Sequence, residues 1–236
     1  MSDKAKIEII PAVLPTSWKN LEANLTLLRD VTRHAQIDIV DGHFAHGKTW
    51  PYKDGAQFAK IIEQEHGLPL WEELDFEFDL MVEDPLAVMM DYVHAGASRL
   101  VVHARSKTAA AAAQHLIELN EESGSFSVQV GVALEALGSP DELLTFEEQY
   151  DFVQVMGAEH IGKQGEPLSQ KAVFLIERLR RRYPLLPIQI DGGVRLDNVK
   201  QLVAAGATRL IVGSAIFATD DVPAAYKALY TEANAQ

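Results

Sequence analysis

Short apolar runs recur along the whole chain, and each is followed by a longer segment whose apolar residues have helical spacing. The runs are continuous rather than alternating, which is typical of parallel strands that are buried on both faces. In the first helical segment, Leu21, Leu25 and Leu28 have the spacing of one helix face. The runs that we assign to strands are Ile7–Val13, Gln36–Val40, Phe76–Val82, Arg99–His103, Ser127–Ala133, Phe152–Met156, Pro187–Asp191 and Arg209–Val212.

These eight strand–helix units in 236 residues predict an α/β fold, the closed (β/α)8 or TIM barrel, for which about 250 residues is usual. An open, doubly wound sheet is the alternative, but eight regular units favour closure. Gly96 and Gly206 each precede a strand within an Ala-Gly-Ala motif, where glycine is expected to end a helix in the left-handed conformation. No linker rich in Ser, Gly or Pro divides the chain, so we expect residues 1–236 to form a single domain.

Composition excludes several classes of function. The chain has 21 Lys and Arg against 34 Asp and Glu, a net charge of −13, which opposes the clustered basic charge of nucleic-acid binding. It has no cysteine, which excludes disulfides, thiolate metal sites and cysteine nucleophiles. The sequence has no apolar run of the ~18 residues that a membrane span needs, and its polar start does not resemble a signal peptide. We expect a cytoplasmic protein with neither a nucleic-acid nor a membrane partner.

Three aspartates interrupt or end apolar strands. Asp38 and Asp79 lie inside the second and third predicted strands, and Asp191 ends the seventh. The active site of a TIM barrel lies at the C-terminal ends of the strands, so these side chains are expected to converge there. A buried carboxylate is costly unless it is paired, hydrogen-bonded or bound to metal, so three at one barrel mouth predict a functional site. Asp41, which Gly42 follows, is expected instead to cap a turn.

Glycine pairs follow the last two predicted strands. Gly192 and Gly193 come after the seventh strand, and Gly213 and Ser214 come after the eighth. In this fold the loops after these two strands commonly form a phosphate site, in which backbone N–H groups bind the anion. Taken alone, each pair is more often a tight turn. Together, at the two expected strands, these residues predict phosphate binding.

At this point the motifs resemble those of the ribulose-phosphate 3-epimerase family, along nearly the whole chain. The order and spacing of five blocks carry the resemblance: Ile10–Leu14, Asp38–Phe44, Leu80–Pro85, Asp191–Gly193 and Gly213–Phe217. The resemblance implies a (β/α)8 barrel that inverts C3 of a pentulose 5-phosphate, using two aspartates on opposite faces of the carbon and a divalent metal. It also implies a homo-oligomer and a sugar-phosphate substrate.

Residue by residue, the resemblance implies that Asp38 and Asp191 are the acid–base pair, which exchanges the C3 proton through an enediolate. Met81 and Met156 match methionines that line the family's site, and His43 is expected in the same substrate pocket. The residues that match the family's phosphate loops are Gly192, Gly193, Gly213 and Ser214.

The chain departs from the family pattern at the metal. The family's site uses two histidines and two aspartates, and this chain has Gln36 and Asp79 at the histidine positions. With Asp38 and Asp191 they form an all-oxygen set, which suits Mg²⁺ or Mn²⁺, whereas imidazole suits Zn²⁺. A bound cation, a protonated aspartate and a wider separation of the aspartates all remain open, because three adjacent carboxylates repel one another. Loop histidines that can supply a substitute ligand are His43, His46 and His160.

We predict an epimerase that converts D-ribulose 5-phosphate to D-xylulose 5-phosphate. Because Ala12 and Pro15 stand where the family pattern has serines, another sugar-phosphate enzyme on the same barrel, such as a different epimerase or a decarboxylase, is one alternative. A non-catalytic sugar-phosphate binder is the other. The replacement of both histidines favours a binder, and the presence of Asp38 and Asp191 in costly apolar positions opposes it.

Overall fold

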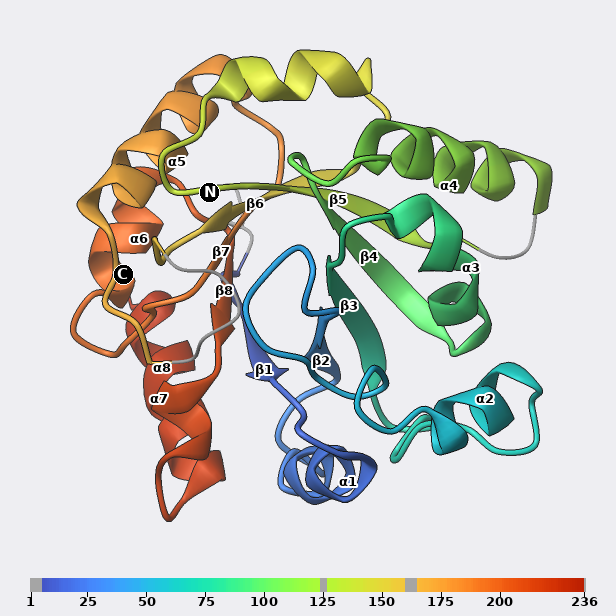
Figure 1. The fold of residues 1–236 in the computed structure, drawn as a ribbon. Helices are drawn as coiled ribbons and strands as arrows, with labels where there is room; N and C mark the ends of the chain where they lie inside the picture. Colours follow the sequence, from blue (N-terminus) through green and yellow to red (C-terminus); the bar gives the residue numbers. More distant parts are fainter. Residues whose placement is uncertain (1–5, 124–126, 160–164, 236) are drawn as a thin grey trace.

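The computed structural model describes residues 6–123, 127–159 and 165–235. Eight parallel strands close into a barrel in chain order, and the last strand pairs with the first (Figure 1). Each predicted strand is present, with ends displaced by at most two residues. The strands are β1 (Glu8–Val13), β2 (His34–Val40), β3 (Asp75–Met81), β4 (Ala97–His103), β5 (Gln129–Leu134), β6 (Phe152–Met156), β7 (Ile188–Asp191) and β8 (Arg209–Val212).

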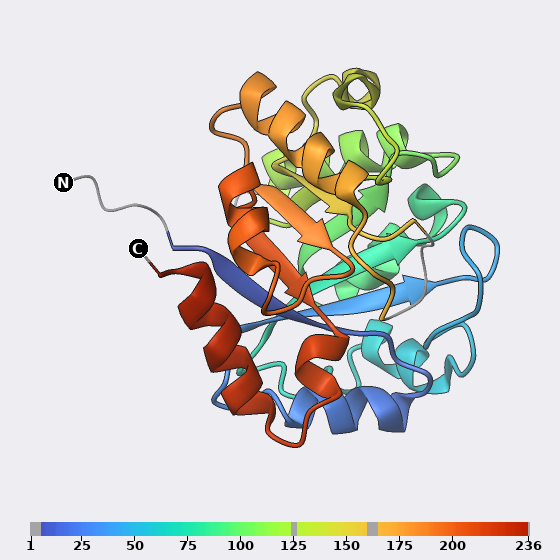
Figure 2. The ribbon, with the colours of Figure 1, turned by 90° about the vertical axis from the view of Figure 1, so that its left-hand side faces the viewer.

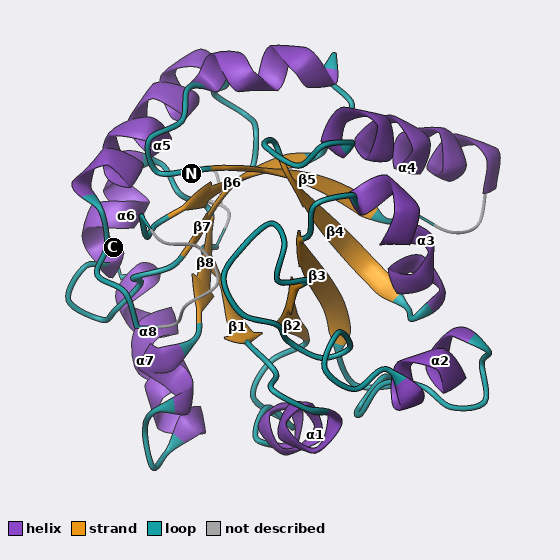
Figure 3. Ribbon diagram, viewed as in Figure 1, coloured by secondary structure: helices purple, strands orange, loops and turns teal. Residues whose placement is uncertain are grey.

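Helices surround the barrel on its outer side (Figure 3). They are α1 (Trp18–Thr26), α2 (Ala56–Ile62), α3 (Pro85–His94), α4 (Ala109–Ser123), α5 (Gln170–Arg182), α6 (Val199–Ala205), α7 (Ser214–Phe217) and α8 (Val222–Ala233), with a 3-10 helix, η1 (Pro140–Phe146), after β5. Within the described ranges, no helix is both long and apolar enough to cross a membrane. The predicted (β/α)8 architecture is confirmed.

Local sequence explains where the helices start, pack and end. Ser17 caps α1 by accepting a hydrogen bond from the backbone of Asn20, and Leu21 and Leu25 of that helix are fully buried against the strands. Gly206 ends α6 at φ +116°, and Gly96 follows α3 at φ +95°, so both glycines have the predicted left-handed backbone.

The two ends of the described chain meet at the end of the barrel where the strands begin (Figure 2). The Asn234 side chain accepts a hydrogen bond from the Ile7 nitrogen at 2.8 Å and donates one to the Ile7 oxygen at 3.1 Å. This contact anchors the end of α8 next to the start of β1. The opposite end of the barrel, where the strands finish, carries the loops that surround the site.

Two layers of side chains fill part of the barrel interior, and each takes one residue from β2, β3, β6 and β7. The lower layer is Gln36, Glu77, Gln154 and Gln189, all at most 1% exposed. The upper layer, two residues further along each strand, is Asp38, Asp79, Met156 and Asp191. Parallel register aligns the layers, because Gln36 is the partner of Glu77, and Asp38 is the partner of Asp79. Inward-facing residues alternate along a strand, so both members of each pair point into the barrel.

Below the lower layer, Arg99 connects the interior to the start of the barrel. Its Nη1 atom lies 3.6 Å from Glu77 Oε2, and its Nη2 atom lies 3.2 Å from Glu8 Oε1. Burial raises the pKa of Glu77 to about 7, although the charges of Arg99 and Arg209 and a hydrogen bond from Gln189 oppose the shift. Ionisation of Glu77 is therefore harder in the folded protein than in the unfolded chain.

This burial predicts a pH-dependent stability. Between pH 4.5, the ordinary pKa of this group, and about 7, only the unfolded chain gains by releasing the proton, so the free energy of unfolding falls as pH rises. The contribution of Glu77 to that fall is about 3 kcal/mol. In Glu77→Gln the contribution is absent, so the difference in unfolding free energy, variant minus wild type, should grow by this amount between about pH 4 and about pH 8.

Urea unfolding at both pH values measures this difference. The exposed Glu22→Gln variant is the matched control and should show the same difference from the wild type at each pH. A difference for Glu77→Gln that does not change with pH contradicts the expectation.

Candidate active site

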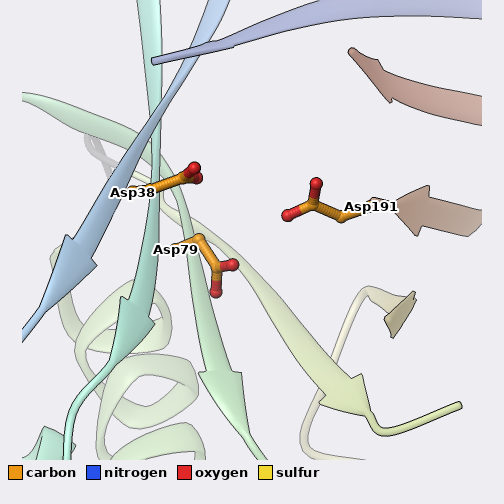
Figure 4. A group of neighbouring side chains, drawn as sticks. All are labelled: Asp38, Asp79 and Asp191. Atoms are coloured by element: carbon orange, nitrogen blue, oxygen red, sulfur yellow. The ribbon is translucent and has the colours of Figure 1, made fainter. Parts of the chain in front are cut away.

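The carboxylates of Asp38, Asp79 and Asp191 meet at the end of the barrel where the strands finish (Figure 4). One oxygen of each lies within 4.8 Å of the oxygens of the other two. Asp38 and Asp79 stand side by side on neighbouring strands, and Asp191 points toward them from β7. Asp38 is 7% exposed and Asp79 is fully buried. The structure thus brings the three aspartates together, without the wide separation that the sequence left open.

Gln36 bridges the two carboxylates that the sequence assigns to proton transfer. Its Nε2 atom donates to Asp38 Oδ1 at 2.8 Å and to Asp191 Oδ2 at 2.9 Å. Its oxygen faces the other way, 3.4 Å from the Nε2 atom of Gln189. The amide nitrogen therefore faces the carboxylates, and ligation of a cation by Gln36 requires the amide to turn over. The ligand role of Gln36 stays a prediction.

Two buried side chains that the sequence analysis did not select hold Asp79. His103, at the end of β4, has its Nε2 atom 2.8 Å from Asp79 Oδ1, and Gln154 donates to Asp79 Oδ2 at 3.1 Å. The His103 ring packs at 5.0 Å between centroids against Phe44, from the loop after β2. A signal for both was present: His103 ends an apolar run as Asp191 does, and Gln154 interrupts one as Asp38 does.

Burial and mutual repulsion make Asp38 and Asp191 hard to ionise. Burial raises the pKa of Asp38 well above its ordinary value, and the charges of Asp191 and Asp79 raise it further. The pKa of Asp191 rises to about 7, chiefly through burial and then through Asp79, while the hydrogen bond from Gln36 opposes the shift in both groups. Near neutral pH the two carboxyl groups together therefore retain a proton.

The donor set fits a hard divalent cation. Asp38, Asp79 and Asp191 each offer an oxygen to one point, and carboxylate oxygens suit Mg²⁺ or Mn²⁺. A bound cation also removes the repulsion among the three carboxylates. The imidazole that lies nearest, His103, already directs Nε2 at Asp79, so it supports a carboxylate instead of adding a nitrogen ligand to the set.

Two of the loop histidines, His43 and His46, lie outside this cluster. His43 and His46 are exposed in the loop after β2, where they line a cavity of ≈ 490 Å³ together with Glu83, Arg105 and Lys107. The role of His43 in the substrate pocket stays a prediction, and His160 lies outside the described residues. In the same loop, Asp41 accepts hydrogen bonds from the backbone of His43, Phe44 and Glu83, so it caps the turn as expected.

Both predicted methionines are buried near the end of the barrel that carries the carboxylates. Met156 belongs to the upper layer and is 6% exposed, and Gln154 Nε2 contacts its sulfur at 3.3 Å. Met81 is 2% exposed and follows Asp79 by two residues on β3, so it faces the same side of the strand. An apolar and polarizable lining of this kind surrounds a reacting carbon without competing for protons.

The predicted phosphate loops leave β7 and β8 at the same end of the barrel. Gly193 has φ +71°, and a Cβ there would lie 2.5 Å from the backbone nitrogen of Leu168, so this position requires glycine. Gly192, at φ +106°, follows Asp191 directly. Gly213 precedes the short helix α7, whose first residue is Ser214. Their binding role stays a prediction, and the backbone places them beside the carboxylates.

Comparison with known proteins agrees with this geometry. The chain is 29% identical over 211 residues to the ribulose-phosphate 3-epimerase of Schizosaccharomyces pombe, covering 89% of this chain and 86% of the relative. It is 28% identical to that of Aquifex aeolicus, covering 92% of each chain.

Solved structures share the barrel at lower identity. They include 3-hexulose-6-phosphate synthase from Salmonella typhimurium, at TM-score 0.68 and 16% identity over 96% of this chain and 98% of that one. Orotidine 5'-phosphate decarboxylase from Pyrococcus horikoshii matches at TM-score 0.63 and 20% identity, over 97% and 100%. At these identities the likeness shows the fold alone. The family model, in contrast, matches residues 8–217, nearly the whole barrel with its three aspartates and both glycine loops, and the chain belongs to the ribulose-phosphate 3-epimerase family.

Proposed function

We propose that the protein inverts C3 of a ketose phosphate by proton transfer between Asp38 and Asp191, and that D-ribulose 5-phosphate and D-xylulose 5-phosphate are the pair that it interconverts. One observation carries the proposal. The two carboxylates come from β2 and β7 and are bridged by the Gln36 amide, at 2.8 and 2.9 Å. Two carboxyl groups on different walls of the mouth can reach opposite faces of one carbon between them.

The raised pKa values of Asp38 and Asp191 support one role as proton acceptor and one as proton donor. One aspartate must be ionised to remove the C3 proton, and the other must hold a proton to return it to the opposite face. Before a cation binds, burial raises the pKa of both groups, and of Asp191 to about 7, which favours the mixed protonation state at neutral pH. In the reverse direction the two groups exchange roles, so a single site serves both epimers.

A divalent cation held by Asp38, Asp79 and Asp191 would act as a Lewis acid and stabilise the negative charge that develops on the substrate oxygens. The protein's own groups also hold the site in place. Gln154 and His103 fix the two oxygens of Asp79. The glycine loops after β7 and β8 provide backbone N–H groups for the phosphate, which fixes the sugar relative to the aspartates.

Two further expectations accompany this function. A homo-oligomer is expected from the family resemblance, and a cytoplasmic location is expected from the sequence. One relative, from Oryza sativa, is a cytoplasmic isoform of ribulose-phosphate 3-epimerase, with 27% identity over 92% of this chain.

Single-aspartate variants test the proton transfer. The wild-type protein in D₂O should introduce deuterium at C3 of D-ribulose 5-phosphate and form D-xylulose 5-phosphate, as followed by NMR. Asp38→Asn and Asp191→Asn should each slow interconversion by about 10²- to 10⁴-fold, because each removes one general acid–base group. Each variant should still exchange the C3 proton of one epimer, and the two variants should act on different epimers.

Asp30→Asn changes an exposed carboxyl group beyond the end of α1 and serves as the control, with wild-type exchange expected. Absence of C3 exchange by the wild-type protein, with Mg²⁺ or Mn²⁺ present and with any ketose phosphate, contradicts the proposed function. Exchange of the same epimer by both variants contradicts the two-base assignment.

A glycine substitution tests the phosphate loop. Gly193→Ala should raise KM for the ketose phosphate by about tenfold or more, because a left-handed backbone and a collision with Leu168 displace the loop. Gly96→Ala is the matched control, because Gly96 also has positive φ but nothing lies within 4 Å of its added Cβ. Steady-state kinetics and melting temperatures of both variants are compared. An equal effect on KM in the two variants contradicts the assignment.

Calorimetric titration with Mn²⁺ tests the cation site. After chelator treatment, the wild-type protein should bind one Mn²⁺ per chain, and Asp79→Asn should bind it at least about tenfold more weakly, since even partners of metal ligands contribute this much. Asp30→Asn should bind as the wild type does. Equal Mn²⁺ affinity in wild type and Asp79→Asn would show that the three carboxylates do not hold the ion.

A further inference from the structure

Gln189, in the lower layer, is a fully buried amide that the proposed reaction does not use. Its Nε2 atom lies within hydrogen-bond distance of three acceptors, each on a different strand. They are Glu77 Oε1 at 2.5 Å, Gln154 Oε1 at 2.7 Å and Gln36 Oε1 at 3.4 Å. The NH₂ group has two hydrogens, so the three acceptors share them, and the longest contact, to Gln36, is the weakest. Gln189 therefore connects β7 to β3, β6 and β2 at one point inside the barrel.

The chemistry of these partners fixes which way each amide faces. The ionised Glu77 carboxylate only accepts hydrogen bonds, and its other oxygen lies 3.6 Å from Arg99 Nη1, so the nitrogen of Gln189 faces Glu77 Oε1. That nitrogen in turn attracts the amide oxygens of Gln154 and Gln36. With their oxygens held from below, both glutamines present their NH₂ groups to the upper layer.

Turning any of these amides over produces two conflicts. A reversed Gln36 would place its oxygen against Asp38 and Asp191, and its NH₂ group against that of Gln189. A reversed Gln154 would place its oxygen against Asp79 in the same way. Pairs of acceptors and pairs of donors repel, so only one set of orientations satisfies the network.

The consequence reaches the carboxylates directly. The two hydrogens of the Gln36 amide are both used, one on Asp38 and one on Asp191. One NH₂ group thus bridges these two carboxylates, and the oxygen of the same amide lies 3.4 Å from Gln189 Nε2. Gln154 fixes Asp79 by the same arrangement.

From this geometry we propose that Gln189 is a positioning residue for the acid–base pair: its amide nitrogen orients Gln36 and Gln154 so that their NH₂ groups hold the three carboxylates in place. The link to catalysis rests on the proposed function, whereas the orientation of the amides stands without it. Among the described residues, the Gln189 oxygen has no hydrogen-bond partner. An unpartnered buried oxygen lowers the stability of the folded protein, so stability alone does not explain why position 189 carries an amide.

The first experiment observes the amides without any turnover. In the ¹⁵N-labelled wild-type protein, the side-chain NH₂ signals of Gln36, assigned by their loss in Gln36→Leu, should lie downfield and exchange slowly with solvent, because both hydrogens are on carboxylates. In Gln189→Met, which keeps the volume and removes the donor, these signals should move and exchange at least about tenfold faster.

The second experiment measures kinetics on the same proteins. Gln189→Met should lower kcat for the ketose phosphate by about 10- to 100-fold, as expected for loss of a partner that orients a functional group. KM should change by less than about twofold, because the phosphate loops are unchanged. Gln189→Asn keeps the amide but shortens the side chain by one methylene. It should also change the Gln36 NH₂ signals and lower kcat, each by less than Gln189→Met does. This second variant keeps the test valid if Gln189→Met does not fold.

Gln114→Met provides the control. Gln114 is exposed on α4 and donates to Glu118 of the same helix, so its loss should change neither the Gln36 signals nor kcat. Unchanged Gln36 signals in Gln189→Met and in Gln189→Asn overturn the proposal, whatever happens to the melting temperature. Altered signals with unchanged kcat in an active protein also overturn it. If the wild-type protein shows no turnover, the proposed function fails, and the amide signals alone decide whether Gln189 orients Gln36.

Discussion

Three carboxylates within 4.8 Å of one another, two of them buried and that of Asp191 half-buried, are the constraint around which this barrel is arranged. Each would be costly to bury alone, and together they repel. The interior offsets this cost with donors at short range: the amides of Gln36 and Gln154 and the imidazole of His103 all direct nitrogen atoms at carboxylate oxygens. The offset is partial, since the pKa of Asp38 and of Asp191 stays raised. The raised pKa values fit the proposed function, because a carboxyl group that retains its proton near neutral pH can act as an acid.

Parallel register makes the arrangement possible. Residues two apart on one strand face the same side, and neighbouring strands align Gln36 with Glu77 and Asp38 with Asp79. The lower layer of three amides with Glu77 and the upper layer of three carboxylates with Met156 therefore follow from one alternation that is repeated on separate strands. TIM barrels usually fill this space with branched apolar residues. Here the polar layers replace part of that packing, and apolar residues such as Ile10 and Ile211 fill the remainder.

The sequence predicted the parts that depend on local pattern. Continuous apolar runs located all eight strands, and the aspartates within or at the ends of three of them predicted the cluster at the barrel mouth. The sequence analysis did not select the buried side chains that hold the aspartate cluster in place, and the reason is physical. A single buried glutamine, such as Gln154 or Gln189, gives no direction for its amide, and only the closed barrel shows what it faces. A weaker signal was available, because each of these glutamines precedes an upper-layer residue by two positions.

The shared donor at Gln189 has an evolutionary consequence. A histidine at position 36, as in the family pattern that the sequence resembles, would lack the amide oxygen that now accepts from Gln189 and the second hydrogen that now bridges Asp38 and Asp191. The buried NH₂ group of Gln189 would lose an acceptor at the same step. Positions 36 and 189 are thus coupled, so a lineage that exchanges the glutamine for a histidine is expected to change both, and neither residue is informative about the site without the other.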